Sequence, residues 1–104
     1  MKQYEKIEGT KKELKIEVYY DKGGMNYFSG KVDPRGYWVS VRSVERDIRE
    51  NGIAVESYSL MSGVRHFLLA VKRQSDKAYD QAVELHKDIL PKLKENILQS
   101  LQTV

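Results

Sequence analysis

The 104-residue sequence contains no cysteine and only two prolines. The absence of cysteine excludes disulfide bonds, thiolate-held iron–sulfur clusters and cysteine-ligated zinc sites. Stability must therefore come from a packed core, which a chain of this length is long enough to build. The composition agrees, since 40% of the residues are hydrophobic and 32% are charged, as in a globular domain. We expect a single domain over residues 1–104, with residues 1–12 forming a loosely ordered lead-in.

Long apolar runs are also absent. The first fifteen residues are rich in lysine and glutamate and lack the apolar stretch of about 7–15 residues that a signal peptide requires. The longest apolar stretch, Phe67 to Val71, is far shorter than the roughly 20 residues of a membrane-spanning helix. These absences predict a soluble, cytoplasmic protein without a membrane partner.

Recognisable catalytic and metal-binding motifs are missing as well. His86 falls on an apolar helical stripe and His66 lies beside Phe67, so neither has the spacing of a metal ligand or a catalytic base. The pair Gly23-Gly24 lacks the lysine and hydroxyl residue that complete a phosphate-binding loop. We therefore expect a protein that is not an enzyme, with no catalytic residue, no metal site and no cofactor.

Charge is plentiful and unevenly distributed. The net charge is +3, and the excess lies in residues 22–73, where nine basic and five acidic residues give +4. Residues 1–21 are neutral overall, and residues 74–104 carry −1. A basic central region is compatible with binding to a polyanion, and it is equally the ordinary solvated surface of a mildly basic protein.

Alternating apolar and polar residues predict strands in the first half of the chain. From Leu14 to Tyr20 every second residue is apolar, as in a strand with one buried face. Glycine and proline mark turns at residues 21–24 and 33–36. These boundaries predict four strands, over residues 14–20, 25–32, 37–42 and 53–60.

The second half of the chain has helical spacing. Residues 43–50 are predicted to form a short helix that Asn51-Gly52 ends, although these two residues could instead close a hairpin directly. Residues 63–73 are predicted to form a longer helix with Ser62 as its N-cap. The run from Phe67 to Val71 is also compatible with a strand. An apolar stripe over residues 76–101 continues in phase through Pro91, which predicts one helix kinked there. The resulting fold class is α+β, an antiparallel four-stranded meander followed by two C-terminal helices packed on one face.

Aromatic residues suggest a binding surface. Eight of the ten aromatic residues lie between Tyr19 and Phe67, among the basic excess. Strand alternation places Tyr19 beside Lys15 and Trp38 beside Arg42, on the sheet face that the helices leave open. Single-stranded nucleic acid binds such surfaces, because its bases stack on the rings while cations contact its phosphates. Two alternatives remain open: the rings are covered by the N-terminal residues, or they form an interface with a protein partner or a second copy.

Two resemblances rest on residues 19–28 (YYDKGGMNYF) and 34–41 (PRGYWVSV). With these segments the chain resembles small uncharacterised proteins of bacterial phages and mobile elements, which implies a bacterial cytoplasmic setting and no particular activity. A protein-interaction or inhibitor module of a mobile element, which can be homodimeric, is the alternative function.

A fainter likeness is to the single-stranded-DNA-binding transcriptional positive cofactor family. There a basic residue also precedes the order Gly-apolar-Ser-apolar, as in residues 35–41 here. That family has a single helix after its strands, whereas another strand and two helices are predicted here. The likeness therefore assigns no binding residue to this chain.

Overall fold

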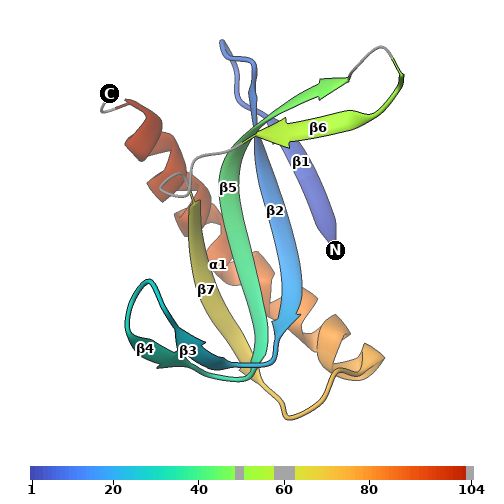
Figure 1. The fold of residues 1–104 in the computed structure, drawn as a ribbon, viewed down its shortest axis with the longest axis vertical. Coiled ribbons are helices and arrows are strands. Elements are labelled where there is room, and N and C mark those ends of the chain that lie inside the picture. The colour runs from blue at the N-terminus through green and yellow to red at the C-terminus, as the bar shows by residue number, and fades with distance from the viewer. Residues whose placement is uncertain (49–50, 58–62, 103–104) are drawn as a thin grey trace.

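The computed structural model describes residues 1–48, 51–57 and 63–102. These residues form an α+β domain in which antiparallel strands are followed by one C-terminal helix (Figure 1). In chain order the elements are β1 (Lys2–Lys6), β2 (Lys12–Asp21), β3 (Gly24–Asn26), β4 (Lys31–Asp33), β5 (Gly36–Ile48), β6 (Ala54–Ser57), β7 (Gly63–Ala70) and α1 (Asp76–Gln102).

The main sheet is organised around the long strand β5. One edge of β5 pairs with β2, which in turn pairs with β1. The other edge is shared, since β7 pairs with the first half of β5 and β6 pairs with its end. Strands β3 and β4 form a separate hairpin arm, inserted between β2 and β5, at the lower end of the molecule in Figure 1.

Helix α1 covers one face of the main sheet, and the core lies between them. The apolar residues that strand alternation identifies in β2, namely Leu14, Ile16 and Val18, are buried there. They meet alternate residues of β5 and the apolar stripe of α1. From β5 these are Tyr37, Val39 and Val41, and from α1 they are Ala78, Ala82, Leu93 and Ile97.

The long helix begins where the sequence predicts. The Ala78 amide donates a 3.1 Å hydrogen bond to Ser75 Oγ, the N-cap interaction, and Asp76 lies in the first turn. The helix runs through Pro91 as one element, which confirms a single helix over this region. Among the described residues no helix is both long and apolar enough to cross a membrane.

The predicted helix over residues 63–73 is wrong, because Gly63–Ala70 forms strand β7. The spacing of Val64, Phe67 and Leu68 fits a helix, but β5 offers an unpaired edge. The segment completes that edge, with Val64 opposite Val41. Pairing of backbone groups across the sheet therefore outweighs the local periodicity.

The predicted short helix over residues 43–50 is also wrong where the structure describes it. β5 continues to Ile48 and pairs with β6, with Glu45 opposite Ser57. The expected fourth strand, residues 53–60, is present as Ala54–Ser57, and residues 58–60 lie outside the described part of the chain.

Two further differences concern strand count. The expected lead-in contains an edge strand, because Lys2–Lys6 pairs with β2. The expected second strand, residues 25–32, is instead the two short strands β3 and β4, joined by a turn over residues 27–30. Its Gly30 has a φ of 70°, which a residue with a side chain rarely adopts.

Candidate nucleic-acid interface

The four residues predicted to bind nucleic acid do lie together on the sheet face opposite α1. In the register of β2 and β5, Lys15 is directly opposite Arg42, and Tyr19 is directly opposite Trp38. Their neighbours Ile16 and Val18 point into the helix-facing core, so alternation places these four on the other face. Arg42 is half-buried and interacts with other groups of the protein.

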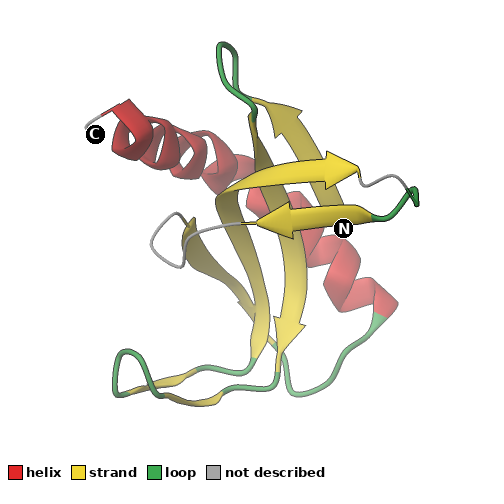
Figure 2. Cartoon of the chain, turned by 45° about the horizontal axis from the view of Figure 1, so that its top comes forward, coloured by secondary structure: helices red, strands yellow, loops and turns green. Residues whose placement is uncertain are grey.

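Several cations of this face are paired with carboxylates of the same chain. Lys15 Nζ lies 2.8 Å from Glu56 of β6, and Arg46 of β5 lies 2.7 Å from Glu13 of β2. These pairs form because the hairpin of β5 and β6 leans across the sheet (Figure 2). Lys2 and Glu17 form a looser pair at 3.7 Å. A phosphate approaching these cations would have to displace an existing ion pair.

Tyr4 of β1 joins the same cluster. Its hydroxyl donates a hydrogen bond to Glu56, and the Arg46 guanidinium lies 3.9 Å from the centre of its ring. Hydrogen bonding to Glu56 raises the pKa of both Tyr4 and Lys15. Hydrogen bonds from Lys15 and Tyr4 lower the pKa of Glu56. We call Tyr4, Lys15, Arg46 and Glu56 the clasp, because they hold the β5–β6 hairpin against β1 and β2.

Trp38 lies on the predicted face, but its ring is covered by other parts of the protein. Only 8% of its surface is accessible. The Arg65 guanidinium lies 4.1 Å from the centre of the indole ring, and Phe67 packs edge-to-face against it at 5.1 Å. Arg65 is held in turn by Asp33 and by Asp21. The indole is therefore part of the packed protein and cannot serve as a stacking platform in this conformation.

A second group of cations lies at the lower end of the sheet, and we call it the basic end. Three connecting segments meet there: the residues after β2, those before β5 and those between β7 and α1. They bring together Lys22, Arg35, Lys72 and Arg73 around a cavity of about 330 Å³, which Tyr20 and Gln74 also line. All four cations are exposed. No carboxylate of the described residues forms an ion pair with any of them.

Close backbone contacts fix the shape of the basic end. The Arg35 Nε group donates a 2.9 Å hydrogen bond to the carbonyl oxygen of Lys22. The Tyr20 hydroxyl donates one of 3.0 Å to the carbonyl oxygen of Lys72, which ties the β7–α1 connection to β2. Gly23 has a φ of 76°, and a side chain there would lie 2.9 Å from the Asp33 carbonyl oxygen. Only glycine fits at that position.

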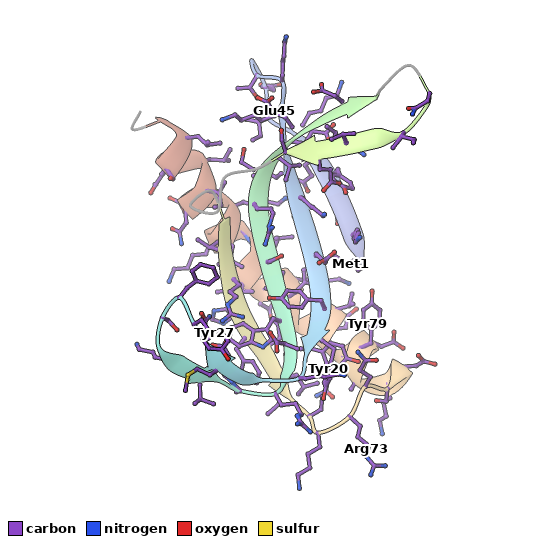
Figure 3. The ribbon with its side chains drawn as sticks, viewed as in Figure 1. Met1, Tyr20, Tyr27, Glu45, Arg73 and Tyr79 are labelled. Carbon is purple, nitrogen blue, oxygen red and sulfur yellow. The ribbon has the colours of Figure 1, made fainter. Side chains whose placement is uncertain are left out.

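The hairpin arm of β3 and β4 rises directly from the basic end, since Lys22 precedes it and Arg35 follows it. At its tip Tyr27 is 91% exposed and Phe28 is 93% exposed, and Figure 3 shows Tyr27 on this arm. The tip is ordered by hydrogen bonds, because Asn26 Oδ1 accepts from the Phe28 amide at 3.0 Å. Two aromatic rings are therefore exposed at the tip of an arm whose base carries Lys22 and Arg35.

Sequence reasoning missed the basic end. Its four cations come from three separate segments of the chain, and each stands in a turn or a connecting segment rather than on a patterned strand. The basic excess of residues 22–73 includes all four, so composition pointed to the correct region without identifying the residues. The partner of Lys15 was equally hidden, because Glu56 lies forty-one positions later in the chain.

Groups suited to catalysis are sparse in the described ranges. His86 is buried in α1 with its Nδ1 in hydrogen-bond contact with the Val83 carbonyl oxygen, and His66 is exposed on β7. No cluster of three or more histidine, aspartate or glutamate side chains suited to a metal ion occurs among the residues that the structure describes.

Comparisons with known proteins found no match: no protein-family profile, no curated protein and no solved structure resembles this chain to a significant degree. The resemblances to phage and mobile-element proteins and to the positive cofactor family therefore stay predictions.

Proposed function

We propose that the protein is a non-enzymatic module that binds single-stranded nucleic acid through the basic end and the hairpin arm. One observation carries the proposal: four exposed cations, without carboxylate partners among the described residues, lie at the base of an arm whose tip holds two almost fully exposed aromatic rings. Phosphates would contact the cations of the basic end, and bases would stack on Tyr27 and Phe28. The sheet face opposite α1, which the sequence predicts as the binding surface, then has a structural role.

Pairing of charges supports this choice of surface. A cation without a protein partner binds phosphate at the expense of mobile counterions, whose release favours association at low salt. A cation already paired, such as Lys15, must first give up Glu56. The gain from a new phosphate contact is then largely offset by the lost ion pair, so the basic end is the better polyanion site.

The exposure of the aromatic rings also supports this choice of surface. Stacking of a base on an aromatic side chain contributes about 1–3 kcal/mol, and it requires an accessible ring face. Tyr27 and Phe28 have such faces, whereas Trp38 does not. Because stacking accepts any base, the proposal predicts weak dependence on nucleotide sequence.

The test is a fluorescence-anisotropy titration of a labelled oligothymidylate of about 12 nucleotides over a series of salt concentrations. For wild-type protein we expect the logarithm of the affinity to fall with log salt by about 0.7 for each phosphate contacted. The double variant Lys72→Ala/Arg73→Ala removes two such cations, so its slope should be smaller by about 1.4.

A matched control removes the same charge elsewhere. Lys2→Ala/Lys87→Ala deletes two cations that are paired with Glu17 and Glu84. Its salt slope should equal that of the wild type. Absence of binding by wild-type protein at low salt would refute the proposed function, and equal losses in both double variants would refute the assignment to the basic end.

A second candidate function is protein interaction, including homodimer formation, through the hairpin arm. Met25 and Val32 are 62% and 72% exposed on the same hairpin as the two rings, which is a large apolar surface for a short arm. Sedimentation velocity distinguishes the candidates. A dimer that Phe28→Ser converts to monomer would favour this second function, and a monomeric wild type would count against the homodimer.

A further inference from the structure

A second cavity opens beside the basic end, and tyrosines form much of its wall. It encloses about 350 Å³ and is lined by Tyr20, Tyr37, Gln74, Ser75, Asp76 and Tyr79. The three rings form a chain of edge-to-face contacts, with Tyr20 to Tyr37 at 5.4 Å and Tyr37 to Tyr79 at 6.1 Å. In Figure 3, Tyr20 and Tyr79 lie close together at the end of the molecule where Arg73 is found.

This tyrosine cavity adjoins the cavity of the basic end. Tyr20 and Gln74 line both, so the two cavities are neighbours, and we call the pair the hollow, with an aromatic half and a cationic half. At about 350 and 330 Å³, each half is near the lower end of the range for small-molecule sites. A ligand that contains a flat ring and an anionic group could therefore place the ring in one cavity and the anionic group in the other.

We infer that this double cavity binds one nucleoside phosphate unit, with its base against Tyr20 and Tyr79 and its phosphate among Lys22, Lys72 and Arg73. The inference deepens the proposed function and rests on it, because the unit is taken to be the terminal nucleotide of a bound strand. A free mononucleotide has the same chemistry and is the other source that the experiment must separate.

The polar groups of the tyrosine cavity fit a nucleoside. The Gln74 side chain can both donate and accept hydrogen bonds at the edge of a base. The Asp76 carboxylate can accept from an amino group or a ribose hydroxyl, and no described cation is paired with it. The Tyr37 hydroxyl is already bonded to the backbone of Ser75, so Tyr37, only 4% exposed, forms the floor.

Charge divides the hollow in the same way. The cationic half holds Lys22, Arg35, Lys72 and Arg73, and the carboxylate of Asp76 lies in the aromatic half. A phosphate placed in the aromatic half would meet Asp76, whereas the residues that line the cationic half include four cations and no carboxylate. This distribution of charge favours one orientation of a bound nucleotide, with its phosphate in the cationic half.

Isothermal titration calorimetry with three probes tests the inference: adenosine 5′-monophosphate, adenosine and inorganic phosphate. We expect the monophosphate to bind at least about tenfold more tightly than either fragment, because it occupies both halves at once. Tyr79→Leu keeps an apolar side chain but removes a ring, and should weaken the monophosphate by about fivefold or more. Tyr4→Leu makes the same change on β1, outside the hollow and outside the proposed binding surface, and should leave the monophosphate affinity unchanged.

Oligothymidylates with and without a 5′-phosphate separate the two sources. Tighter binding of the phosphorylated strand, lost in Lys72→Ala/Arg73→Ala, identifies a strand terminus as the ligand. Binding of the monophosphate without any preference for the phosphorylated strand identifies a free nucleotide. If the strand binds but the monophosphate gives no heat at millimolar concentration, the inference is refuted while the proposed function stands. If the monophosphate binds and no strand does, the proposed function fails and the cavity assignment remains.

Discussion

The sheet face opposite α1 and the basic end carry similar residue types but differ in ion pairing and exposure. On the sheet face, Lys15 and Arg46 are paired with carboxylates, and Trp38 is covered by Arg65. At the basic end, cations such as Arg73 have no carboxylate partner among the described residues, and the aromatic rings of the hairpin arm that starts there are in solvent. The comparison teaches that aromatic and basic side chains are available for binding only where they are not already packed or ion-paired within the protein.

The largest expected change in the free energy of unfolding is at Trp38, and measuring it would sharpen this comparison. Trp38→Ala leaves a cavity and should lower the free energy of unfolding by about 3–5 kcal/mol. Phe28→Ala, at the exposed hairpin tip, should change it by less than about 0.5 kcal/mol. Urea denaturation followed by circular dichroism measures both. Equal stability of the two variants would mean that the indole is not packed as the structure shows.

The next effect concerns Arg65, which links the sheet face to the hairpin arm. Its guanidinium covers Trp38 and is paired with Asp33, and hydrogen bonding to Asp33 raises the pKa of Arg65. Arg65→Met should cost about 0.5–2 kcal/mol of stability, because it removes the contact of the guanidinium with the largely buried Trp38 ring. Asp33→Asn and the double variant complete a thermodynamic cycle. Additive losses would show that the two side chains do not interact.

A smaller, pH-dependent effect tests the clasp. Because the pKa of Glu56 is lowered below its ordinary value of 4.5 in the folded protein, its stabilising contribution is present above about pH 4.5. It is lost as pH falls through the folded pKa. Glu56→Gln should therefore be less stable than wild type at pH 7, and the gap should narrow on acidification.

Glu84→Gln is the control for the clasp, since Glu84 is a highly exposed helix residue paired only with Lys87 three positions later. It should show almost no stability difference from wild type at either pH. A gap for Glu56→Gln that stays constant from pH 7 to pH 3 would contradict the clasp.

The smallest stability effect belongs to the basic end. Lys72→Ala/Arg73→Ala should leave the free energy of unfolding within about 0.5 kcal/mol of wild type, because both side chains are exposed and neither has an ion-pair partner among the described residues. Thermal denaturation provides the check. A large loss of stability would show that these cations have a structural role, as those of the sheet face do.

Strand alternation and capping predicted much of the fold. The buried face of β2, the face on which Trp38 lies and the start of α1 at Ser75 were all readable, because each depends on residues close together in the chain. That β7 is a strand rather than a helix could not be predicted in the same way. Its spacing fits a helix, and only the vacant edge of β5, more than twenty positions earlier, makes it a strand.

The candidate site was less predictable for a related reason. Alternation shows which side chains share a sheet face, but it does not show which segment folds over that face. Glu56 reaches Lys15 because the β5–β6 hairpin leans across the sheet, and Arg65 reaches Trp38 from the neighbouring strand. The basic end depends on three turns meeting at one point, which no local pattern encodes.

The most direct measurement is a map of amide and indole NMR signals during titration with an oligothymidylate. Trp38 supplies the only indole N–H signal, which reports on the sheet face without overlap. We expect the largest shifts at Lys22, Phe28, Arg73 and Gln74, with the Trp38 indole signal unmoved. Shifts centred on Lys15, Tyr19, Trp38 and Arg42, with the basic end silent, would contradict the account.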